Sequence, residues 1–134
     1  MPVIAVSVAA PAFAASAGLP SAEFSPGSCR CVNDKLYRLA VTFTNSTTAT
    51  YLITGISLTA VLRGITFPPG QAASVPPGTS TVVFNFTSSN NASALQLTLV
   101  YTATNLSTQE VSPDQTLTGT VPFPQCDVCP TQND

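Results

Sequence analysis

The four cysteines of this chain are the residues whose type and spacing could do chemistry. Cys29 and Cys31 form a C-x-C pair, and Cys126 and Cys129 form a C-x-x-C pair near the end of the 134 residues. Such pairs bind zinc as thiolates, exchange electrons as a dithiol, or close structural disulfides. The C-x-C spacing matches zinc knuckles poorly, and no α/β pattern surrounds the C-x-x-C pair as it does in thiol oxidoreductases.

Residues for other kinds of chemistry are scarce. The chain has no histidine, which removes the commonest general base and the commonest metal ligand. Serine and threonine are abundant, but a hydroxyl is a weak nucleophile without a base beside it. No two acids are spaced as a carboxylate pair or a calcium loop; they are Glu23, Asp34, Glu110, Asp114, Asp127 and Asp134. We therefore expect no enzymatic activity, no bound metal and no cofactor.

Charge is unusually sparse along the chain. Charged residues make up 7% of it, against about 25% in ordinary globular proteins. Between Leu39 and Gln109 the one charged side chain is Arg63. With a net charge of −2, the sequence lacks the basic surface of a nucleic-acid-binding protein. Serine, threonine and asparagine must supply the polar surface, as in many extracellular β-proteins.

The N-terminal residues 1–14 are apolar, small and uncharged. They are typical of the end of a bacterial secretion signal, with a small-residue cleavage site at Ala12-Phe13-Ala14. The alternatives are an ordinary N-terminal β-strand of this chain and a strand that residues 2–14 donate to a neighbouring subunit. We expect no membrane span, because the apolar run is short and Pro11 interrupts it. Export predicts an extracellular or cell-surface location.

Export also favours disulfides, because thiols pair in oxidising compartments. A bridge from Cys29 to Cys31 would close a strained ring, so we expect each to pair with Cys126 or Cys129. Both of the remaining pairings join the two ends of the domain and stay open at this point. A zinc site would need all four cysteines to meet, and it is kept as an alternative.

The rest of the sequence alternates between apolar and polar residues with period two, and turn-forming residues break the alternation. No apolar stripe has helical spacing. We expect residues 15–28 to be a linker or first edge strand, 29–130 the folded domain, and 131–134 a tail. The pattern predicts an all-β, immunoglobulin-like antiparallel sandwich of about seven strands. The expected inward residues are Tyr37, Leu39, Val41, Phe43, Leu52, Ile56, Leu58, Ala60, Leu62, Val82, Phe84, Phe86, Leu95, Leu97, Leu99, Tyr101, Ala103, Leu117, Val121 and Phe123.

Three stretches carry a resemblance to a known family: YRLAVTFTNSTTATYLITGISL, ASVPPGTSTVVFNF and LTLVYTAT. They resemble the bacterial cell-adhesion-related immunoglobulin-like modules, in which an asparagine ends one strand and a Pro-Gly turn leads into another. Asn45 and Pro77-Gly78 occupy those positions, and the resemblance covers roughly residues 35 to 122. It implies a non-catalytic surface module used as a spacer, adhesin or accessory domain.

Two residues are candidates for contact with a partner. Arg63 is an isolated charge in a neutral region, and Phe67 precedes a Pro-Pro-Gly turn that predicts an exposed loop tip. The leading hypothesis is a secreted or surface-attached binding module for a protein or a carbohydrate. The alternatives are a structural subunit that assembles by N-terminal strand donation and a small zinc-stabilised module.

Overall fold

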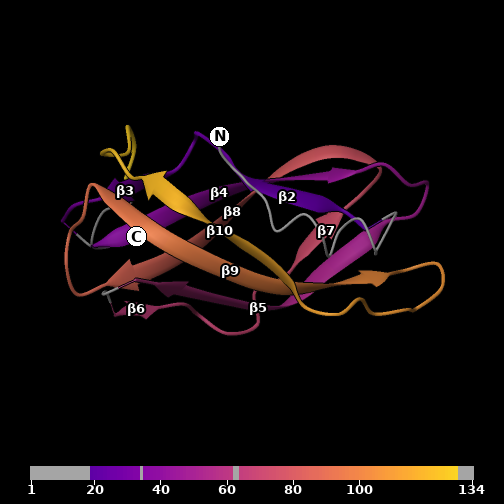
Figure 1. The fold of residues 1–134 in the computed structure, drawn as a ribbon. Helices are drawn as coiled ribbons and strands as arrows, with labels where there is room; N and C mark the ends of the chain where they lie inside the picture. The colour runs from indigo at the N-terminus through magenta and orange to yellow at the C-terminus, as the bar shows by residue number, and fades with distance from the viewer. Residues whose placement is uncertain (1–18, 34, 62–63, 130–134) are drawn as a thin grey trace.

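The computed structural model describes residues 19–33, 35–61 and 64–129, and it consists of two antiparallel β-sheets packed face to face (Figure 1). The described residues form nine strands and no helix, which confirms the predicted all-β sandwich. The nine strands are β2 (Ser21–Phe24), β3 (Cys29–Cys31), β4 (Leu36–Asn45), β5 (Tyr51–Ala60), β6 (Ile65–Thr66), β7 (Ala73–Val75), β8 (Gly78–Ser88), β9 (Ala94–Asn105) and β10 (Gln115–Pro122).

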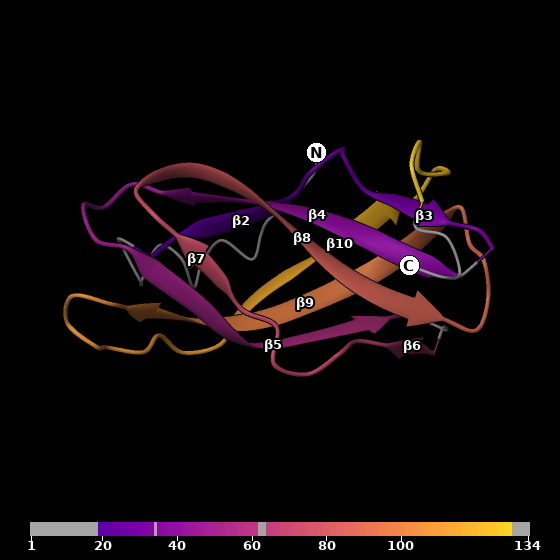
Figure 2. The same ribbon diagram turned by 180° about the vertical axis from the view of Figure 1, so that it is seen from behind.

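One sheet has the strand order β10-β9-β5-β7, and the other has the order β2-β4-β8-β6 (Figure 2). The short strand β3 also pairs with β4, beside Leu36–Arg38, while β2 lies beside Val41–Thr44. Strands β2 and β3 are therefore two parts of one edge, separated by a turn. Short edge strands of this kind account for the difference between nine strands and the roughly seven expected, because the alternation signal of two to four residues is weak.

Several expectations concern residues outside this description. The segment 1–14, the alternative in which residues 2–14 donate a strand, and the tail 131–134 all fall there. In the part of the chain that is described, no helix is long and apolar enough to cross a membrane.

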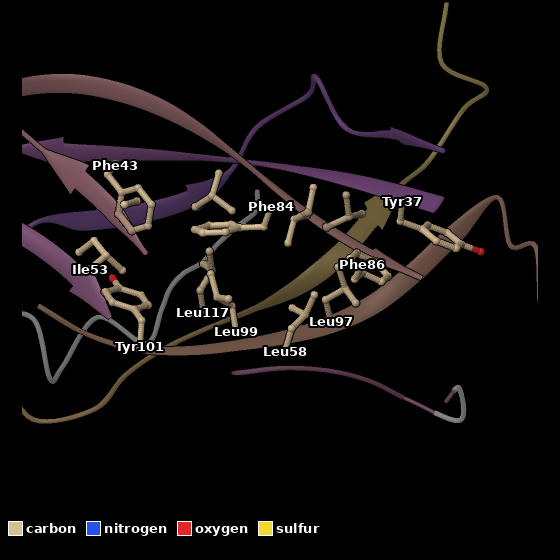
Figure 3. Close-up of a cluster of buried hydrophobic side chains, with 14 of the residues drawn as sticks. Tyr37, Phe43, Ile53, Leu58, Phe84, Phe86, Leu97, Leu99, Tyr101 and Leu117 are labelled. Carbon is tan, nitrogen blue, oxygen red and sulfur yellow. The ribbon is translucent and has the colours of Figure 1, made fainter. Parts of the chain in front are cut away.

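The core lies between the two sheets, and aromatic and aliphatic side chains from both meet there (Figure 3). Every residue predicted to point inward from β4 and β9 is buried, because neither strand has an irregularity that would change its phase. The ring of Phe43 on one sheet meets the ring of Tyr101 on the other edge-to-face, with centroids 5.6 Å apart. Such pairs favour one position of each sheet relative to the other.

The prediction for β5 was wrong at its start. Leu52 was expected inward, but Tyr51 and Ile53 are the buried residues, and Leu58 is buried further along. The pairing with β9 shifts between Thr54 and Ser57, around Gly55. A bulge adds one residue to one strand and so reverses which face the later side chains take.

Gly55 has a backbone conformation that favours glycine, with φ at +61°. A Cβ at this position would also lie 3.3 Å from the Thr102 hydroxyl oxygen. We expect Gly55→Ala to lower the free energy of unfolding by about 1–2 kcal/mol, measured by urea denaturation. Gly64→Ala is the matched control, because a Cβ at Gly64 meets nothing within 4 Å. Equal stability of the two variants would contradict this account of the bulge.

Candidate functional site

The two cysteine pairs lie at one corner of the sandwich. Strand β3 carries Cys29 and Cys31, and the segment after β10 runs beside it. The Arg30 amide donates to the Pro124 carbonyl at 2.8 Å, and the Cys126 amide donates to the Arg30 carbonyl at 2.9 Å. These backbone bonds bring together pairs that are nearly a hundred residues apart, as the sequence predicted for the ends of the domain.

The structure decides between the two pairings that remained open. Cys29 is bonded to Cys126 and Cys31 to Cys129, with Cα–Cα distances of 5.0 and 5.7 Å. Both distances fall within the usual range for disulfides. The two bridges have sequence separations of 97 and 98 residues, so each ties the first part of the domain to the last.

The same corner is compact enough to resemble a metal site. The Sγ atoms of Cys31, Cys126 and Cys129 all lie within 4.8 Å of one another. Zinc is bound by cysteine as the thiolate, and a disulfide sulfur carries no such charge. In its disulfide form the corner is therefore a structural link between strands, with no ligand set for zinc.

Of the two predicted contact residues, the structure describes one, Phe67. Arg63 lies outside the described residues. Phe67 is half-buried against the core, and its ring centroid lies 6.2 Å from that of Phe84. The expectation of an exposed aromatic at a loop tip was wrong, because the tip is formed by the exposed residues 68–70 that follow. An apolar ring beside an open edge of the core gains more by packing inward than by facing water.

A pocket of about 310 Å³ lies where β9 ends and β5 begins, at the other end of β9 from the cysteines. Part of its wall is the loop that joins β9 to β10. It is lined by Leu19, Tyr51, Asn105, Glu110, Val111, Ser112 and Pro113.

The β9–β10 loop is held by its own hydrogen bonds. The Asn105 side-chain oxygen accepts from the amides of Ser107 and Thr108, at 2.8 and 3.2 Å. The Asn105 amide donates to the Glu110 carbonyl at 2.9 Å, which closes the loop at its base. The Ser112 hydroxyl further accepts from the Ala103 amide at 2.9 Å. The pocket wall is thus preformed, which reduces the entropy that a ligand would have to order.

The groups that the pocket offers are suited to binding. The Tyr51 hydroxyl accepts from the Asn105 side-chain amide at 3.3 Å, so its own O–H is left to donate. Glu110 is exposed and supplies a carboxylate acceptor, while Leu19 and Val111 supply apolar wall. The Ser112 hydroxyl donates to the Pro113 carbonyl at 2.9 Å and not to a base that would activate it. The combination fits a small polar ligand with an apolar face, such as a sugar ring.

The sequence did not single out Tyr51 or Glu110. Tyr51 and Asn105 are 54 positions apart and meet only because β5 pairs with β9. No motif near Tyr51 or Asn105 in the sequence marks a site. Their contact follows from the strand register alone. The one local signal was the turn chemistry of Asn105, whose side chain caps the loop.

The Tyr101 hydroxyl is buried in the core, and it has no hydrogen-bond partner among the described atoms. Burial raises the pKa of this phenol above its ordinary value, because the charged form would lose its hydration. The hydroxyl therefore stays neutral at physiological pH. We assign it no acid–base role.

The outer face of the β10-β9-β5 part of one sheet is uncharged and rich in threonine. Thr118, Thr98 and Thr59 are paired in register and form one row across three strands. The threonines of this face are Thr54, Thr59, Thr98, Thr102, Thr104, Thr116, Thr118 and Thr120. The hydroxyls therefore supply the polarity on this face that charged side chains supply in most domains.

Comparison with known proteins gives no family. No protein-family model matches the chain, and no curated protein matches it. Among solved structures, a FixG-related protein from Vibrio parahaemolyticus is similar with a TM-score of 0.44 and 11% sequence identity. The match covers 78% of this chain and 94% of that one. At this TM-score the likeness carries no argument about fold or function.

Proposed function

We propose that this chain is a non-catalytic, secreted or surface-attached immunoglobulin-like module that binds a protein or a glycan. The observation that carries the proposal is the preformed pocket, where a single carboxylate and a tyrosine hydroxyl lie beside an aliphatic wall. Such a set can position a ligand through hydrogen bonds and apolar contact, and its serine hydroxyl, on Ser112, donates to the Pro113 carbonyl and not to a base.

Two further observations support the location. All four cysteines are used in disulfides, which persist in oxidising compartments and are rare in the cytosol. The N-terminal residues are typical of a secretion signal. A surface whose polarity comes from threonine hydroxyls also suits contact with neutral, hydroxyl-rich partners.

The test is a binding measurement on an immobilised array of neutral and acidic oligosaccharides, with purified cell-surface proteins as a second set of probes. We expect binding by the wild type that falls about tenfold in both variants. Glu110→Gln replaces a charged hydrogen-bond acceptor by a neutral one, and Tyr51→Phe removes a hydroxyl, so each change costs about 1–2 kcal/mol. Glu23→Gln is the matched control, since it removes an exposed carboxylate on β2 that does not line the pocket.

The possible outcomes test the binding function and the location of the binding site separately. If the wild type binds no probe of either set, the binding function is contradicted. If it binds and all three variants bind equally well, the function stands and the pocket is the wrong site.

A further inference from the structure

On the side away from β4, strand β8 has a stretch with which no other described strand pairs. Its ten residues Gly78–Thr87 pair with β4, from Asn45 back to Leu36. On the opposite side, β6 pairs with Thr87 and Ser88 alone, near the end of β8 (Figure 2). In the described part of the chain, nothing pairs with the backbone of Thr79, Thr81 and Val83 on that side. We call these three residues the β8 edge.

Hydrogen bonds fix which backbone groups face this open side. The Gln71 side chain donates to the Asn85 carbonyl at 3.3 Å, so the backbone carbonyl of Asn85 points away from β4. The Ser88 amide donates to the Lys35 carbonyl at 3.2 Å, so even-numbered positions point toward β4. Backbone direction alternates along a strand. The N–H and C=O groups of the β8 edge therefore all face outward.

The β8 edge also lacks the usual protection of edge strands. Natural edges carry a lysine, an internal proline or a bulge, or are very short. The eleven residues of β8 contain no charged residue and no proline, and the pairing with β4 is regular throughout. Val83 is 52% exposed on the same stretch. Such an edge is a template for another strand.

We propose that the β8 edge pairs with the β8 edge of a second copy of this chain, antiparallel and about a two-fold axis at Thr81. In this register Thr81 faces Thr81 of the second copy, and Thr79 faces Val83. Each of the three facing pairs exchanges two backbone hydrogen bonds, about six in all. The sheets β2-β4-β8 of both copies become one continuous sheet.

The ends of the edge favour a second copy over an unrelated strand. The same register places Pro77 of one copy opposite Asn85 of the other. Proline has no N–H to donate, and the Asn85 carbonyl already accepts from Gln71. The missing donor thus meets a carbonyl that already accepts a hydrogen bond, and the pairing ends there. Since β8 carries no charge, two copies also meet without repulsion.

The test uses sedimentation velocity of the full chain over a range of concentrations. We expect the wild type to form a concentration-dependent dimer. Thr81→Lys should weaken dimerisation about tenfold, because two like charges then face each other across the axis. Thr81→Glu should do the same alone, and an equal mixture of the two variants should restore the dimer. Thr118→Lys, an exposed threonine on the other sheet, should dimerise like the wild type.

Because the Thr81 side chain is exposed, we expect its variants to fold. Thermal melts of each variant check this. A wild type that stays monomeric at every concentration would overturn the proposal. So would a dimer that Thr81→Lys leaves intact, including one that depends on residues 2–14 and thus indicates strand donation instead.

Discussion

We expect that removing both disulfides lowers the free energy of unfolding by about 7 kcal/mol, while removing either one alone costs about 2 kcal/mol. The reason is that the two bridges close nearly the same loop, with separations of 97 and 98 residues. While one bridge remains, losing the other opens a ring of only about seven residues. Losing both releases the whole loop, which accounts for the largest part of the expected effect.

The measurement is urea denaturation of three variants: Cys29→Ala with Cys126→Ala, Cys31→Ala with Cys129→Ala, and all four changes together. Alanine avoids burying a new hydroxyl at the enclosed positions Cys31 and Cys126. A loss in the fourfold variant that merely equals the sum of the two others would mean that the bridges constrain separate loops. That result would contradict the claim that both bridges close nearly the same loop.

Asn45 is expected to give the largest effect of any single polar residue. It is 2% exposed, and its side-chain amide donates to the carbonyls of Ala49 and Val75 at 2.7 and 3.1 Å. Its side-chain oxygen accepts from the amide and the hydroxyl of Thr47, at 3.0 and 2.7 Å. We expect Asn45→Ala to cost about 3 kcal/mol, because the Val75 carbonyl is left buried and unpaired. In thermal unfolding this corresponds to a fall in Tm of roughly 10–20 °C.

Asn85→Ala is the control for this prediction, since Asn85 is an exposed asparagine on a strand of the same sandwich. It should change stability by less than about 0.5 kcal/mol. Similar melting temperatures for the two variants would show that the Asn45 bonds do not hold the β4–β5 turn. Enclosure of Asn45 further predicts that its Asn-Ser-Thr sequon is not glycosylated in the folded protein.

The fold class and most of the core were predictable because the long strands are regular. In β4 and β9 the side-chain period of two runs without interruption, so the sequence alternation gives the buried face directly. In β5 the sequence contains Gly55 but does not say how many residues the bulge adds, and the face of Leu52 was therefore mispredicted. Phe67 was misplaced for a related reason, because a turn signal gives the position of a bend and not the side on which the ring packs.

Long-range contacts were only partly predictable. The cysteine spacing allowed two ways of joining the ends, and the choice between them depends on how β3 lies against the segment around Pro124 and Cys126. The pocket depends on the β5–β9 register, which no residue near Tyr51 or Glu110 encodes. Local sequence predicts strands and turns, whereas these features depend on which strands become neighbours.

The central claim is that the cysteines are structural links and not a chemical site, and disulfide mapping of the unreduced, denatured protein tests it most directly. Trypsin separates Cys29 from Cys31 by cleaving after Arg30, and cleavage before Asp127 separates Cys126 from Cys129. Mass spectrometry should then find the Cys29 peptide joined to the Cys126 peptide, and the Cys31 peptide joined to the Cys129 peptide. Free thiols at these positions, or the crossed pairs Cys29–Cys129 and Cys31–Cys126, would contradict the account.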